Sequence, residues 1–132
     1  MALNNRGGIS PRRDQVDLFG RMNTSTNGTI TTQTKRRYSG FTVAKTGTAQ
    51  YTLTVDKVAN RLAEMIALQA TLIGTFAAGR GLVPLVTTDY NTTTGAVVVT
   101  FVNDAGAITG ELPDGVSVMW NLIGSTSVAQ VG

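Results

Sequence analysis

The segment AVVVTFVN, residues 96–103, carries the strongest strand signal in this chain. Six of its eight residues are β-branched or aromatic, and such residues fit the pleated surface of a sheet. The polar run NTTTG, residues 91–95, precedes the segment, and the turn signal Asp104-Ala105-Gly106 follows it. Asn, Asp and Gly favour turns because they adopt or stabilise the backbone conformations that turns require. The sequence therefore predicts a strand that is bounded by turns on both sides.

Two alternating runs further upstream predict a β-hairpin. Residues 38–45 alternate through Phe41 and Val43, and residues 50–56 alternate apolar positions with threonines. The glycine turn at residues 45–47 joins the two runs. Period-2 patterns that are connected by a short glycine turn are typical of hairpins.

Further strands are expected on either side of these segments. Residues 82–88 and 116–123 read as strands, the second after the turn Pro113-Asp114-Gly115, and residues 29–34 as a weaker one. Turns that recur at intervals of roughly 8–15 residues suit an antiparallel β-sandwich. The side chains expected in or near the core are Phe41, Val43, Leu53, Val55, Leu68, Leu72, Val97, Val99, Phe101, Val118, Trp120 and Leu122.

Residues 57–73 are ambiguous by pattern alone. Asp56 suits a helix N-cap, and the apolar residues from Val58 to Leu72 fit helical spacing. Leu62, Ile66, Leu68, Ala70 and Leu72 also share one parity, as a strand requires. Local propensity favours the helix.

The first 28 residues predict an extended arm, and residues 29–132 predict the β-domain. The arm is polar and rich in Gly, and only Val16, Leu18, Phe19 and Met22 offer apolar anchors. A segment of this kind buries too little apolar surface to offset the entropy of ordering it. We therefore expect it to order on a partner.

Basic residues concentrate at this end of the chain. Residues 1–37 carry seven Lys and Arg against two Asp, a net charge of +5, whereas residues 38–132 carry four against six, a net charge of −2. This asymmetry favours an acidic partner surface, while solvated charges and nucleic acid are the alternatives. We do not expect nucleic acid, because no aromatic residues alternate with the basic ones. The candidate docking residues are Arg6, Arg12, Arg13, Arg21, Lys35, Arg36 and Arg37.

The composition argues against an enzyme. The chain has no Cys and no His, which excludes cysteine nucleophiles and thiolate metal sites and removes the commonest general base and the commonest transition-metal ligand. Asp104, Glu111 and Asp114 are the best carboxylates for glycoside hydrolysis or Ca²⁺ binding, but their turn context favours solvated side chains. We expect no catalytic activity, no cofactor, no metal, no secretory signal and no membrane span.

The order of segments resembles small virion structural proteins of tailed bacteriophages. The resemblance runs over residues 38–127, through GFTV (40–43), YTLTV (51–55), LQATL (68–72), NDAGA (103–107) and GSTS (124–127). It implies a β-sandwich of jelly-roll type, with a strand over residues 63–73 after a helical turn at residues 57–62. It offers no catalytic residues.

From this resemblance we expect a capsid decoration, or cement, protein. It would be made in the host cytoplasm, bind the major capsid protein on the outer surface of the virion, stabilise the shell and form a homotrimer. The alternative is a fibre, spike or adhesin module that binds a host-surface glycan. That reading needs exposed aromatic residues on loops, and Tyr90 is the best candidate.

Overall fold

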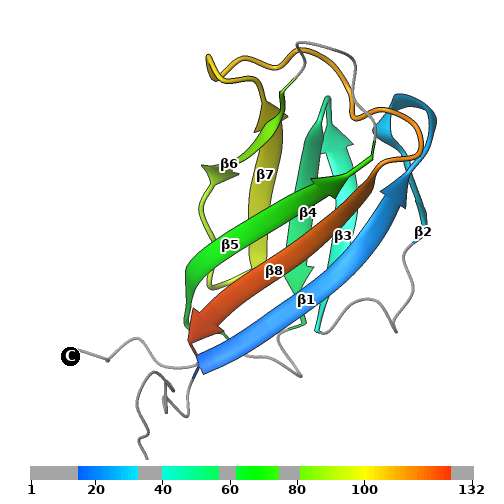
Figure 1. The fold of residues 1–132 in the computed structure, drawn as a ribbon. Coiled ribbons are helices and arrows are strands. Elements are labelled where there is room, and N and C mark those ends of the chain that lie inside the picture. Colours follow the sequence, from blue (N-terminus) through cyan, green and yellow to red (C-terminus); the bar gives the residue numbers. More distant parts are fainter. Residues whose placement is uncertain (1–14, 33–39, 57–61, 75–80, 126–132) are drawn as a thin grey trace, which may run out of the picture.

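The protein is a sandwich of two four-stranded antiparallel sheets in a computed structural model that describes residues 15–32, 40–56, 62–74 and 81–125 (Figure 1). The first sheet has the strand order β2-β1-β8-β5 and the second β3-β4-β7-β6. The elements are β1 (Gln15–Thr24), the 3₁₀ turn η2 (Thr26–Gly28), β2 (Ile30–Thr32), β3 (Phe41–Gly47), β4 (Gln50–Val55), β5 (Glu64–Ile73), β6 (Val83–Thr88), β7 (Ala96–Val102) and β8 (Ser117–Ser125). The predicted all-β sandwich is confirmed, and the narrower jelly-roll assignment stays a prediction. Within the described ranges, no helix has the length and apolarity that crossing a bilayer would require.

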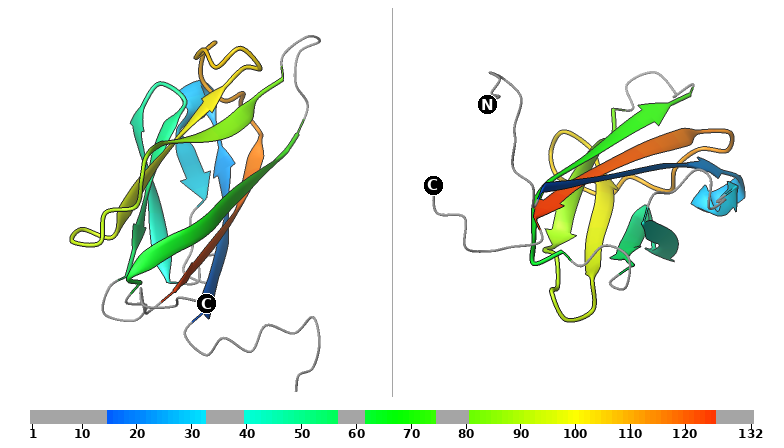
Figure 2. Two further views of the ribbon diagram at one scale, coloured as in Figure 1. Left: turned by 90° about the vertical axis from the view of Figure 1, so that its left-hand side faces the viewer. Right: turned by 90° about the horizontal axis from the view of Figure 1, so that it is seen from below.

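The core lies between the two sheets, which cross at an angle when the molecule is viewed from below (Figure 2). Its centre is an aromatic cluster: the ring of Phe101 lies 5.8 Å from Trp120 and 5.9 Å from Tyr51, centroid to centroid. Ten of the twelve predicted core residues are buried, while Leu68 and Leu72 are half-buried and pack against the cluster. Period-2 alternation therefore identified the inward faces correctly.

Residues 64–73 form strand β5, as the resemblance implied and local propensity did not. β5 pairs with β8 at nine positions, from Glu64 opposite Ser125 to Ile73 opposite Ser117. The pairing places Leu68, Ala70 and Leu72 on the core side of the sheet. Tertiary pairing overrides helix propensity here, because propensity is only a weak local preference. The helical turn expected before β5 falls mainly on residues 57–61, outside the described residues.

The expected boundary between an arm and a domain at residue 28 is wrong. Residues 15–24 form β1, which pairs with β8 at nine positions, and Leu18 and Met22 are buried in the core. A strand with neighbours in a sheet needs few apolar residues of its own, because its backbone hydrogen bonds are satisfied by the pairing. The weak strand expected at residues 29–34 appears as β2, and residues 1–14 lie outside the described part of the chain.

One end of the sandwich is closed by two hydrogen-bonded contacts that tie loops to neighbouring segments. The hydroxyl of Tyr51, on β4, donates a hydrogen bond of 2.6 Å to the carbonyl oxygen of Gly28 in η2. Glu111, which precedes β8, accepts a hydrogen bond of 2.8 Å from the amide of Ala49 and pairs with Lys45 at 3.0 Å. These contacts join the β1–β2 connection to β4, and the β7–β8 connection to the β3–β4 hairpin.

Candidate interaction surface

Arg21 is the one predicted docking residue that lies in the described ranges. It sits on β1 with its side chain half-buried, opposite Met119 of β8. Arg6, Arg12, Arg13, Lys35, Arg36 and Arg37 lie outside the described residues. The structure therefore places a single member of the predicted basic set.

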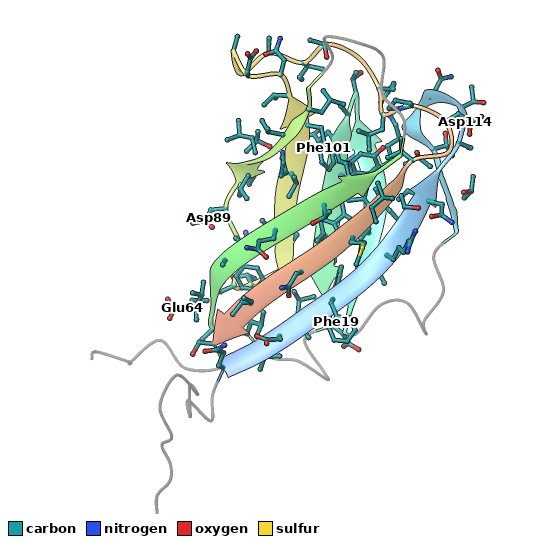
Figure 3. All side chains as sticks on the ribbon, in the orientation of Figure 1. Phe19, Glu64, Asp89, Phe101 and Asp114 are labelled. Carbon is teal, nitrogen blue, oxygen red and sulfur yellow. The ribbon has the colours of Figure 1, made fainter. Side chains whose placement is uncertain are left out.

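The surface around Arg21 is the outer face of the first sheet. Alternation along β1 turns Leu18 and Met22 inward, so that Asp17, Phe19 and Arg21 project outward. The side chain of Phe19 is 63% exposed, and that of Met119 is 45% exposed on the neighbouring strand. Figure 3 labels Phe19 at the middle part of β1. Arg, Met and aromatic residues are enriched at protein interfaces, so this composition favours protein contact.

Beside Arg21 lies a shallow polar depression of about 550 Å³, which we call the Arg21 depression. Its lining residues are Arg21, Asn23, Thr24, Thr31, Gly115 and Ser117. Two hydrogen bonds organise it: an Nη of Arg21 donates to the hydroxyl of Ser117 at 3.2 Å, and that hydroxyl donates to Oδ1 of Asn23 at 2.6 Å. The hydroxyl of Thr31 donates to the carbonyl oxygen of Asn23 at 3.2 Å. One hydrogen bond of this network, to Ser117, directs the guanidinium of Arg21 toward β8.

The Arg21 depression is suited to recognition. A guanidinium has five N–H donors in a planar fork, which matches carboxylate and phosphate groups. The hydroxyl and amide groups around it add further donors and acceptors. In the described part of the chain, no three Asp or Glu side chains gather in a group that could hold a metal ion.

The structure separates the acidic residues that the sequence grouped together. Asp104 and Asp114 are exposed in turns, as predicted. The prediction of a solvated side chain is wrong for Glu111, which is engaged with Lys45 and the amide of Ala49.

Tyr90, the candidate for glycan contact, packs against the core as a half-buried residue. Its hydroxyl donates a hydrogen bond of 3.2 Å to the carbonyl oxygen of Leu62, and burial raises the pKa of its phenol above the usual value. Its hydroxyl therefore already has a protein partner, which weakens the glycan reading for this residue.

Sequence reasoning missed Ser117 as the partner of Arg21, and Asn23 and Thr31 as further members of the same hydrogen-bond network. Ser117 lies 96 residues from Arg21, and only the pairing of β1 with β8 brings the two together. The alternation of Arg21 with Asn23 was visible in the sequence. The inward-facing residues of β1 were harder to recognise, because one of them is Gly20 and because the apolar Phe19 faces outward.

No protein-family model, no curated protein and no solved structure matches the chain.

Proposed function

We propose that the protein is a non-enzymatic virion structural protein, a decoration protein that binds the outer surface of a bacteriophage capsid and stabilises it. The observation that carries this proposal is the outer face of the first sheet. It combines an oriented guanidinium at Arg21 with the exposed apolar side chains of Phe19 and Met119. A small sandwich with such a face has the properties of a docking module.

Charge supports an acidic partner for this face. Arg21 belongs to the basic part of the chain, residues 1–37, whose net charge is +5, whereas the remainder carries −2. Complementary charge steers association and fixes the register of a contact. A capsid repeats the same acidic site many times, so self-associated copies, for instance a homotrimer, would bind with avidity even if each contact were weak.

Binding of purified protein to undecorated capsids tests the proposal. We expect Arg21→Gln and a deletion of residues 1–14 each to weaken binding, most at low salt, where exposed charges are screened least. The deletion leaves β1 whole, because β1 begins at Gln15. Lys45→Gln, which removes a positive charge at the opposite sheet, is the charge-matched control. Full binding by both test variants would refute the proposal.

The runner-up function is a fibre or spike module that binds a host-surface glycan. It is favoured by the polar lining of the Arg21 depression, where hydroxyl, amide and guanidinium groups lie within reach of one ligand. Asn23→Ala and Ser117→Ala would then abolish binding to host cells or surface polysaccharide. Binding to such glycans without binding to capsids would replace the decoration proposal with this one.

A further inference from the structure

Within the described ranges, one long edge of the first sheet, along β1, has no paired strand over most of its length. β8 occupies one side of β1 from Gln15 to Asn23, and β2 occupies the other side only at Asn23 and Thr24. Among the described residues, no strand pairs with that second side of β1 over residues 15–22. An edge of this kind presents a row of backbone N–H and C=O groups to any strand that can approach.

The hydrogen-bonding direction of each residue on β1 follows from one contact. The amide of Thr24 donates to the carbonyl oxygen of Val116 at 2.8 Å, one residue beyond the last pair of the register, in which Asn23 lies opposite Ser117. Even-numbered residues of β1 therefore direct their backbone groups toward β8, since successive residues alternate. The backbone groups of Asp17, Phe19 and Arg21 point to the open edge.

Charges along this edge are complementary to themselves. Phe19 lies near the middle of the open stretch, with Asp17 two residues before it and Arg21 two residues after it. Four residues along a strand span about 14 Å, so Asp17 and Arg21 of one chain cannot pair with each other. In an antiparallel copy that is centred on Phe19, however, each Asp17 lies opposite the Arg21 of the other chain.

We propose that the protein self-associates as a two-fold dimer in which β1 pairs with β1 of a second copy, antiparallel and centred on Phe19. The two first sheets then form one continuous sheet. Two Asp17–Arg21 ion pairs flank the axis on its outer face, where each guanidinium exchanges its hydrogen bond to Ser117 for the Asp17 carboxylate of the second copy. The two Phe19 side chains meet at the axis. On the inner face, Leu18 comes opposite Gly20, which has no side chain to obstruct it.

The length of the proposed β1–β1 pairing is limited by β2. Pairing extends over residues 16–22 and stops where β2 takes over at Asn23. Because the charges along this edge are complementary about a two-fold axis, they favour pairing with a second copy of this chain over pairing with an unrelated strand. It also favours a dimer contact over the homotrimer expected from the sequence. The inference goes beyond the proposed function, since it concerns the purified protein with no capsid present.

A charge swap tests the pairing on the full chain by sedimentation velocity over a range of concentrations. Asp17→Arg and Arg21→Asp each create like charges across the axis, and we expect each to raise the dimer dissociation constant by about tenfold. The double variant restores opposite charges and should return to within about threefold of the original protein. Asp104→Arg, at an exposed turn, is the control with the same charge change and should have no effect. A monomer at all concentrations, or a double variant as weak as the singles, would overturn the proposal.

A single cysteine tests the register independently of charge. Directly opposed residues that exchange hydrogen bonds have Cα atoms about 5.5 Å apart, within the range that a disulfide spans. The chain has no native cysteine. Phe19→Cys should therefore form a disulfide-linked dimer under mild oxidation much faster than Ile108→Cys, a control at a residue that is 53% exposed. Equal rates for the two variants would contradict the proposed axis.

Discussion

Removing one hydroxyl group, with Tyr51→Phe, should loosen the closed end of the sandwich. Tyr51 is fully buried, and its hydroxyl donates to the carbonyl oxygen of Gly28 at 2.6 Å. The substitution keeps the ring, which packs edge-on against Phe101 with an interplanar angle of 73°. Its effect is therefore confined to one hydrogen bond between β4 and η2.

The expected cost lies toward the upper part of the range for a single hydrogen bond. Phenylalanine leaves the carbonyl oxygen of Gly28 facing an apolar ring edge, and a buried polar group that loses its partner costs about 1–3 kcal/mol. Gly28 cannot be replaced to compensate, because its φ is +70°, a backbone conformation that residues with a side chain rarely adopt. We expect the free energy of unfolding to fall by about 2 kcal/mol.

Urea denaturation followed by circular dichroism measures this change. The midpoint should fall while the slope of the transition stays constant, because the surface exposed on unfolding is nearly the same. Tyr90→Phe is the matched control: its hydroxyl is only part-buried and its hydrogen bond is longer, at 3.2 Å, so the loss should be smaller, under about 1 kcal/mol. If Tyr51→Phe leaves the midpoint unchanged, or if Tyr90→Phe costs as much, the closed end does not depend on this contact.

Three further predictions concern the same core and its loops. Burial, and secondarily the charge of Glu111, raises the pKa of Tyr51 above its ordinary value of 10.0. The stability that protonated Tyr51 contributes is therefore complete below pH 10 and declines as the pH rises above 10. Urea midpoints measured in alkaline buffers should fall, and they should fall less in Tyr51→Phe. Glu111→Ala should lower the free energy of unfolding by about 1–3 kcal/mol, because the buried amide of Ala49 loses its acceptor, and Asp104→Ala, which alters an exposed turn, should leave thermal unfolding unchanged. Trp120→Ala should lower the free energy of unfolding by about 3–5 kcal/mol. Trp120→Phe should lower it much less in the same assay, because it keeps an aromatic ring and removes a buried indole N–H that has no hydrogen-bond partner within the described residues.

The sequence predicted the fold wherever the chain alternates with period 2. Phe41 and Val43, or Trp120 and Leu122, each reveal an inward face, because a strand in a two-layered sandwich must be apolar on one side. The same rule failed at β1. There Gly20 occupies an inward position and Phe19 an outward one, so the apolar residues do not alternate cleanly.

The candidate surface was less accessible to prediction because it depends on pairing between distant strands. The basic character of Arg21 was evident, but its contact with Ser117 follows only from the register of β1 against β8. The same holds for Glu111, whose partner Lys45 lies 66 residues away. Local patterns contain no information on such register.

The position of β8 between β1 and β5 has a consequence for how the chain is made. All four strands of the second sheet are complete by Val102, whereas the first sheet lacks its central strand until residues 117–125 have been synthesised. At typical translation rates, β1 waits on the order of 5–20 s for its partner. Nascent chains should therefore build the second sheet first, and overall folding should be slow, because contacts between the two ends of a chain form late. A stop codon only a few residues before Ser117 would leave two strands of the first sheet, β1 and β5, with no strand between them.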